Sequence, residues 1–128
     1  MTTVTAAIII CSNKILITRR AQGKYLAGYW EFPGGKLNDG ETQKECLTRE
    51  IKEELDICVE PHTFFMENTH HYSDRTILLK AYLCKYVSGD ITLKDHDQMA
   101  WVSIHELSNY KFSPADIPFI SSLKKHLP

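Results

Sequence analysis

The chain lacks the features that mark an exported, membrane-spanning or nucleic-acid-coating protein. None of its apolar runs approaches the roughly 18 residues that a membrane-spanning helix needs. Its N-terminal stretch carries no basic segment, so it does not read as a secretory signal. The formal net charge is only −1, which gives no electrostatic case for binding duplex nucleic acid or an anionic membrane. We therefore expect a cytoplasmic protein.

Paired cysteines and domain linkers are also missing. The four cysteines form no C-x-x-C pair, which argues against structural zinc, and we expect them to be reduced, buried small residues. No repeat, low-complexity tract or linker interrupts the 128 residues. Residues 1–128 are therefore expected to form a single domain around one core, as a monomer or weak dimer.

What is present is an order of extended and helical patterns. Apolar and β-branched stretches predict strands at Thr3–Ile10, Ile15–Arg20, Trp30–Phe32, Thr63–Tyr72, Thr76–Val87, Ile91–Lys94 and Met99–Val102. Thr42 and Glu45 form a capping box that opens a helix running to about Leu55. Ser113 and Pro114 open a last helix. This order predicts an α/β protein with a mixed sheet between helices on both faces.

The first helix carries three of its acids close to its buried side. Its apolar stripe repeats at i, i+4 and i+8: Leu47, Ile51 and Leu55. At about 100° per residue, Glu50, Glu53 and Glu54 share an arc of roughly 100°, and Glu54 lies about 60° from the stripe. A lone carboxylate there is costly. A divalent cation or an arginine partner would remove that cost, and Mg²⁺ favours carboxylates together with substrate phosphates.

The residues around this helix recur at fixed gaps. They read Gly35-x5-Glu41-x7-Arg49-Glu50-Ile51-x-Glu53-Glu54-x-x-Ile57. The pattern resembles the Nudix box, the signature of the Nudix hydrolases, except that Asp56 stands where the box has glycine. That glycine would close the helix in a left-handed conformation, which Asp tolerates better than most residues. The resemblance implies the Nudix α/β/α sandwich.

The resemblance also implies a divalent-metal site. In Nudix hydrolases the acids that match Glu50, Glu53 and Glu54 bind the ions, here Mg²⁺ with Mn²⁺ as a second candidate. The Gly34 carbonyl would add a ligand, because a glycine turn lets the backbone approach an ion closely. Three residues are expected to shape the site: Gly35, Glu41, which braces the loop, and Arg49, which orients the acids.

The general base stays open between two sources. Nudix relatives use either a box glutamate, here Glu50 or Glu53, or an acid from a later loop. The spacing of Asp95 to the following tryptophan resembles the MutT-type branch of the family, and Asp97 is the competing loop acid. An ordinary solvated turn before a strand is the alternative to both loop candidates.

The phosphate and base contacts are assigned by similarity to MutT-type members. Strand alternation puts Arg19 and Arg20 on opposite faces. The segments 17–21 and 31–36 resemble that branch and favour Arg20 as the arginine that binds phosphate. Trp30 and Phe32 are either core residues or base stackers, and Phe32 is the candidate substrate contact.

Residues 112–118 resemble the segment that reads the nucleobase in the MutT and CTP-pyrophosphohydrolase branches. Asp116 stands where MutT-type members have Asn. An ionised Asp only accepts hydrogen bonds, whereas a protonated one also donates, which favours modified pyrimidines or broader selection over strict oxidised-guanine specificity. The alternative is that Asp116 caps the last helix.

The resemblance therefore implies a Mg²⁺-dependent nucleoside triphosphate pyrophosphohydrolase. Such an enzyme would release a nucleoside monophosphate and pyrophosphate. It would remove oxidised or noncanonical nucleotides, such as 8-oxo-dGTP or modified pyrimidine triphosphates, from the precursor pool, and so support DNA repair. One alternative is a Nudix hydrolase of ADP-ribose or dinucleoside polyphosphates. A second alternative is a non-catalytic nucleotide-sensing module.

Overall fold

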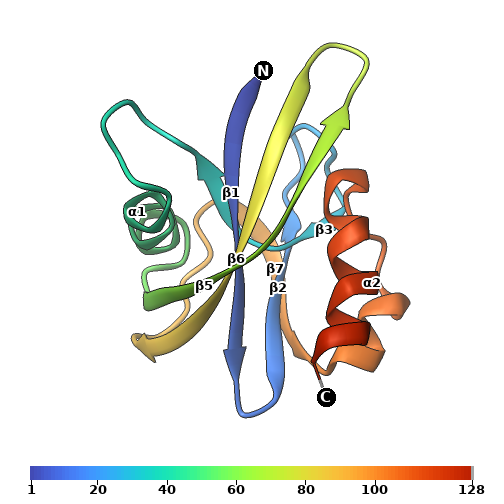
Figure 1. Cartoon of the computed structure of the whole chain (residues 1–128). Helices are drawn as coiled ribbons and strands as arrows, with labels where there is room; N and C mark the ends of the chain where they lie inside the picture. The colour runs from blue at the N-terminus through green and yellow to red at the C-terminus, as the bar shows by residue number, and fades with distance from the viewer. Residues whose placement is uncertain (128) are drawn as a thin grey trace.

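The central strand of the sheet is apolar on both faces. Strand β1 (Thr2–Cys11) buries four consecutive apolar residues, Ala6, Ala7, Ile8 and Ile9, to 1% exposure or less. A strand that is apolar on both sides must be covered on both sides. In the computed structural model, which describes residues 1–127, helix α1 (Gln43–Leu55) covers one face of the sheet and helix α2 (Ile117–His126) covers the other (Figure 1).

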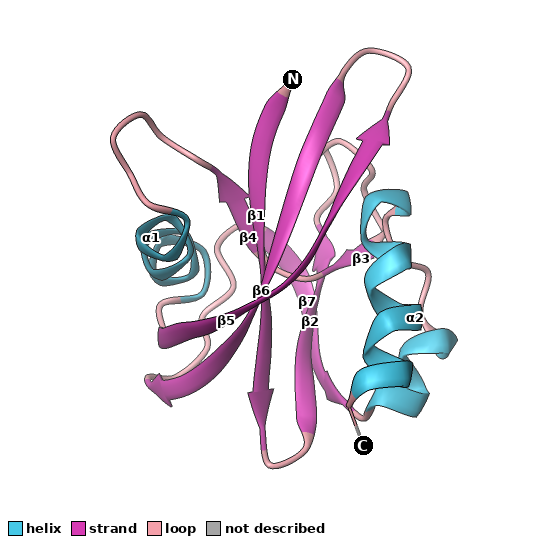
Figure 2. Cartoon of the chain, in the orientation of Figure 1, coloured by secondary structure: helices cyan, strands magenta, loops and turns pink. Residues whose placement is uncertain are grey.

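Six more strands complete a seven-stranded mixed sheet: β2 (Lys14–Arg20), β3 (Trp30–Glu31), β4 (Gly34–Lys36), β5 (Cys58–His71), β6 (Thr76–Ser88) and β7 (His96–Val102). Two 3₁₀ turns, η1 (Ile104–Asn109) and η2 (Pro114–Asp116), lie between β7 and α2. The strand order is β3-β2-β1-β6-β5, with β4 pairing β1 and β7 pairing β2 (Figure 2). Among the strand pairs within residues 1–127, only β1 and β6 pair in parallel. The predicted α/β fold with a mixed sheet between helices is confirmed.

Each face of the sheet has its own apolar core. The helix α1 side packs Leu47, Ile51 and Leu55 against alternate residues of β1, and all three are fully buried, as predicted. The α2 side packs Phe119 and Leu123 against the other set. No helix within residues 1–127 is long and apolar enough to cross a membrane.

Three local predictions were wrong. Residues 91–94 form no strand, because the N–H groups of Thr92 and Lys94 donate to the carbonyls of Leu55 and Glu54 at the end of α1. Cys11 and Cys58 are exposed, so only Cys46 and Cys84 are buried as expected. Ser113 does not cap the last helix.

The start of that helix is reorganised. Turn η2 precedes α2, and the Ser113 hydroxyl lies 3.1 Å from the Tyr72 hydroxyl instead of accepting a bond at a helix start. Asp116 occupies the N-cap position of α2 but its carboxylate makes no capping bond. Asp116 thus lies in the first turn after Ser113, as an acid at N3 would, without a capping hydrogen bond to α2.

Candidate active site

Helix α1 begins and ends as the sequence predicts. The Thr42 hydroxyl accepts a hydrogen bond from the Glu45 N–H at 3.1 Å, and the Glu45 carboxylate accepts one from the Thr42 N–H at 2.8 Å. At the other end, Asp56 is left-handed, with φ 58°, and its N–H donates to the Lys52 carbonyl. Asp56 therefore closes the helix in the conformation that a box glycine would adopt.

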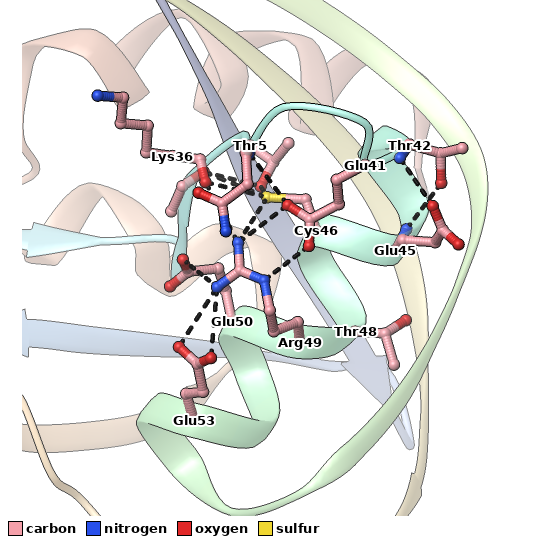
Figure 3. Close-up of polar contacts among 12 residues, drawn as sticks. Thr5, Lys36, Glu41, Thr42, Glu45, Cys46, Thr48, Arg49, Glu50 and Glu53 are labelled. Atoms are coloured by element: carbon pink, nitrogen blue, oxygen red, sulfur yellow. Dashed lines mark hydrogen bonds and ion pairs between the residues drawn. The ribbon is translucent and has the colours of Figure 1, made fainter.

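Arg49 lies among three of the box acids (Figure 3). Its guanidinium donates to both carboxylate oxygens of Glu41 at 2.6 and 3.0 Å, to Glu50 at 2.8 Å and to Glu53 at 3.3 Å. The two-point contact with Arg49 lowers the pKa of Glu41 to about 2. Arg49 is thus anchored by Glu41 and in turn orients Glu50 and Glu53.

Glycine at two positions lets strand β4 sit close to its neighbours. A Cβ atom at Gly35 would lie 2.7 Å from Oε1 of Glu50 and closer still to the rest of that carboxylate. A Cβ atom at Gly34 would lie 2.8 Å from the carbonyl carbon of Thr5 in β1. Burial raises the pKa of Glu50, which Arg49 opposes.

A cavity of about 330 Å³ lies next to these glycines, between the sheet, the loop 21–29 and turn η2. Several of the predicted site residues line it: Arg20, Phe32, Gly34, Gly35, Glu54, Asp95 and Asp116. The other predicted site residues lie outside its lining: Glu41, Arg49, Glu50, Glu53 and Asp97. The predicted site residues thus fall into two groups, those that line the cavity and those outside it. The acids outside the cavity bind an arginine: Glu41, Glu50 and Glu53 bind Arg49, and Asp97 binds Arg19.

Three buried polar atoms within residues 1–127 have no hydrogen-bond partner, and all belong to residues that line this cavity. They are Oε1 of Glu54, Nδ1 of His96 and Oδ1 of Asp116. Buried polar side-chain atoms are paired in the large majority of cases, because an unpaired one loses its hydration without compensation. A polar ligand or an ion in the cavity would supply the missing partners.

The surroundings of the Glu54 carboxyl group disfavour its negative charge. Its pKa is raised to about 9, mainly by burial and also by the nearby acids Glu31, Glu50 and Asp95. Arg20 opposes the shift but does not bond to Glu54. The arginine partner considered for Glu54 is therefore absent, and a positive ion is the remaining way to hold it as a carboxylate.

The carboxylates of the first helix are ligands of the type that a hard divalent cation prefers. Glu50, Glu53 and Glu54 offer carboxylate oxygens, which Mg²⁺ prefers. In the present arrangement Arg49 holds Glu50 and Glu53, and within residues 1–127 no three His, Cys, Asp or Glu side chains are arranged to hold an ion. Metal binding would therefore require Glu50, Glu53 and Glu54 to come closer together than they lie here.

The two arginines at the end of β2 have different partners. Arg20 lines the cavity and donates to Oε1 of Glu31 at 2.9 Å and to the Tyr25 carbonyl. Arg19 faces away and makes a two-point contact with Asp97 at 2.8 and 3.1 Å. This contact lowers the pKa of Asp97, so Asp97 is committed to Arg19 outside the cavity.

Two further acids of the cavity lining, Asp95 and Asp116, differ in exposure. Asp95 is half exposed and lies 3.8 Å from the Lys24 ammonium. Asp116 is 4% exposed. Burial raises its pKa well above the ordinary value of 3.8, and Glu31 adds to the rise. These causes favour a protonated Asp116, which can both donate and accept a hydrogen bond.

Phe32 serves the core and the cavity together. It is 3% exposed and its ring lies 5.2 Å from that of Phe112, yet it also forms part of the cavity lining. The two sequence interpretations of Phe32 are therefore compatible. Trp30 packs against Tyr110 and takes no part in the lining.

Several lining residues were not predicted for the site. Glu31 forms a hydrogen-bonded chain with Arg20 and His96, and Tyr25, Tyr72 and Arg75 also line the cavity. The Tyr25 and Tyr72 rings meet edge to face at 5.6 Å, with the Arg75 guanidinium 4.9 Å from the Tyr25 ring centre. Glu31 could have been predicted, because it directly precedes the candidate substrate contact Phe32. No sequence feature distinguished His96, which stands between two candidate acids.

Comparisons with known proteins identify the family of this chain. The model of the NUDIX domain matches residues 5–122. The chain is 35% identical over 122 residues to the CTP pyrophosphohydrolase of Escherichia coli K12, covering 95% of this chain and 90% of that protein. It is 35% identical over 114 residues to the 8-oxo-dGTP diphosphatase of the same organism, covering 89% and 88%.

A solved structure extends the likeness to three dimensions. The solution structure of the E. coli ORF135 protein matches with a TM-score of 0.87 at 34% identity, covering 100% of this chain and 94% of that one. The match of the family model, the identity to curated enzymes over most of their length and the shared fold confirm the predicted resemblance. The chain belongs to the NUDIX family of hydrolases.

Proposed function

We propose that this protein is a Mg²⁺-dependent nucleoside triphosphate pyrophosphohydrolase that removes oxidised or noncanonical nucleotides from the precursor pool. Water would attack a phosphorus of the triphosphate, a phosphoanhydride bond would break, and a nucleoside monophosphate and pyrophosphate would leave. Relatives named for CTP and for 8-oxo-dGTP support this class of substrate. Such a role would belong in the cytoplasm and would protect DNA from damaged precursors.

One observation carries the proposal. The unpaired atoms of Glu54, His96 and Asp116 all belong to residues that line a single cavity, whose lining includes both acids and arginines. A nucleoside triphosphate is a ligand with a charged end and a hydrogen-bonding end, so it can satisfy separate polar atoms along one cavity. A small anion or an apolar ligand would leave one or the other unpaired.

The metal end would be formed by Glu50, Glu53, Glu54 and the Gly34 carbonyl. Mg²⁺, or Mn²⁺ in its place, would there neutralise phosphate charge and favour ionisation of the attacking water. Arg49 already orients two of these acids. Glu54 would become ionised on metal binding, because the ion supplies the positive charge that its surroundings lack.

The remaining roles follow from the cavity lining. Arg20 presents donors that match a phosphate in two-point contacts. Among the loop acids, the geometry favours Asp95 as the proton acceptor, because Asp95 lines the cavity while Asp97 is held by Arg19 outside it. The box glutamates Glu50 and Glu53 stay as competing bases. Phe32 and Asp116 would contact the nucleobase.

Product analysis tests the proposal. The purified chain is incubated with Mg²⁺, Mn²⁺ or EDTA and a panel containing 8-oxo-dGTP, dGTP, CTP, a 5-modified cytidine triphosphate, ADP-ribose and a dinucleoside polyphosphate. We expect metal-dependent release of nucleoside monophosphate and pyrophosphate, fastest with a modified triphosphate. Reaction in ¹⁸O-labelled water then identifies the phosphorus that is attacked.

Other outcomes select the alternatives. Preferential cleavage of ADP-ribose or a dinucleoside polyphosphate would assign the chain to a different substrate class within the family. Nucleotide binding without hydrolysis of any compound in the panel would support a sensing module. Neither binding nor hydrolysis would remove the nucleotide proposal altogether.

A further inference from the structure

The carboxylate of Glu31 is held from both sides inside the cavity. Its Oε1 accepts a hydrogen bond from Arg20 at 2.9 Å, and its Oε2 lies 2.8 Å from Nε2 of His96. The three side chains are 16%, 28% and 4% exposed for Glu31, Arg20 and His96. Glu31 is thus the fixed middle of a chain that ends at the arginine proposed to bind phosphate.

The register of the sheet places these three side chains on one face. Paired residues of neighbouring strands point to the same side. Thr18 pairs with Glu31, and Arg20, two residues further along β2, pairs with His96. The strand register shifts between Arg19 and Arg20.

That shift decides which residue of β7 reaches Glu31. Arg19 pairs with Gln98, so an unbroken ladder would place Asp97 opposite Arg20. The bulge skips Asp97 and brings His96 opposite Arg20 instead. Asp97 is left to bind Arg19 on the outer side. The bulge therefore places the imidazole of His96, rather than the carboxylate of Asp97, beside Glu31.

His96 can donate a hydrogen bond to the Glu31 carboxylate, which an ionised acid at this position could not. An ionised carboxylate only accepts hydrogen bonds, so the short contact requires His96 to donate through Nε2. Packing alone does not account for a histidine at this position. Its Nδ1 is buried without a partner, which an apolar side chain of similar size would avoid.

We propose that His96 is a positioning residue for nucleotide hydrolysis, acting through Glu31 to hold the Arg20 guanidinium in a fixed direction at the cavity. This role rests on the proposed function. The Glu31 side chain has several rotatable bonds and lies near the acids Glu54 and Asp116. When Oε2 is released, Glu31 can turn away, and Arg20 then keeps only the Tyr25 carbonyl as a partner.

Three variants test this role. His96→Leu removes the donor, His96→Gln keeps one, and His105→Leu changes an exposed histidine of η1 that lies outside the cavity. With the best triphosphate of the panel, we expect kcat/KM to fall about tenfold to a hundredfold in H96L, as for loss of a hydrogen bond to a charged group. H96Q should recover most of the rate and H105L should match the wild type.

A double-mutant cycle separates positioning from simple packing. Because His96 acts through Glu31, adding H96L to E31Q should change kcat/KM by less than about twofold, although H96L alone has a large effect. If the effects of H96L and E31Q multiply, or if H96Q is as impaired as H96L, His96 does not act through Glu31 and the proposal is overturned. Thermal unfolding of each variant verifies that the compared chains are folded.

A measurement without substrate tests the contact itself. In the free protein, the ¹⁵N NMR spectrum should show a His96 Nε2–H that is protected from solvent exchange and shifts in E31Q. Its absence from folded wild type overturns the proposal. An active wild type with an equally active H96L overturns the role of His96 alone, whereas a wild type that hydrolyses nothing overturns the proposed function and this role with it.

Discussion

Gly35 and Glu50 share one small volume, because the carboxylate of Glu50 lies where a side chain at position 35 would begin. A Cβ atom at position 35 would lie 2.7 Å from Oε1 of Glu50. The Gly35 of the box is therefore explained by contact with one of the acids fifteen residues later in the chain. This relationship gives the first prediction.

Gly35→Ala should give a folded chain with impaired hydrolysis. The collision is with the end of a flexible side chain, so Glu50 can move aside and leave its place near Arg49. We expect kcat to fall about tenfold or more, since a displaced catalytic group costs that much. Gly34→Ala is the matched comparison for stability, because its collision is with the backbone of β1 and should lower the unfolding temperature more than Gly35→Ala does.

Glu53→Gln tests the metal assignment. Glu53 is largely exposed and contacts only Arg49, so its replacement should leave the fold intact. We expect turnover with Mg²⁺ to drop by about a hundredfold or more, because a charged ligand becomes neutral. Mg²⁺ should raise the unfolding temperature of the wild type by mass action and do so less in the variant.

Glu60→Gln is the control for that experiment, since Glu60 is an exposed acid on β5 away from the cavity. It should retain wild-type turnover and the wild-type response to Mg²⁺. A folded E53Q protein that hydrolyses nucleotides at a near-normal rate would rule out the metal role of Glu53.

Asp116→Asn should alter the ranking of substrates. An ionised acid only accepts hydrogen bonds and a protonated one also donates, whereas an amide always offers one acceptor oxygen and one N–H₂ donor group. We expect the ratio of kcat/KM for cytosine-type over guanine-type triphosphates to change by about tenfold or more, the scale of one two-point base contact. An unchanged ratio would take Asp116 out of base recognition.

The same variant should change how stability depends on pH. The pKa of Asp116 is raised in the folded chain, so the folded state keeps a proton that the unfolded state releases above its ordinary pKa of 3.8. Stability from this group is complete below that value and falls as pH rises towards the folded pKa. Asn cannot release a proton.

In EDTA, D116N should therefore lose less stability than the wild type as the pH rises above about 4. Urea midpoints measured across that range provide the comparison, with Asp90→Asn as an exposed control. Part of the decline should persist, because Glu54 also has a raised pKa and contributes with the same sign. Parallel profiles for D116N and the wild type would show that Asp116 is ionised in the folded chain.

Local interactions explain where sequence reasoning succeeded. The Thr42–Glu45 capping box, the stripe of α1 and the left-handed Asp56 depend on residues within four positions of one another. Periodicity and cap chemistry report such contacts directly. The strand predicted at residues 91–94 failed because its backbone donors found the carbonyls at the end of α1, which no local pattern shows.

The sequence by itself determined the apolar faces, the caps of helix α1 and the fixed spacing of the box acids, because each is a property of neighbouring residues. Only the tertiary structure decided which of these acids face the cavity and which face an arginine. Arg49 draws Glu50 and Glu53 to itself, a bulge opposite Arg20 selects His96 over Asp97, and burial favours a protonated Asp116. Strand register and burial depend on distant segments meeting, and the energy of a charge depends on what then surrounds it.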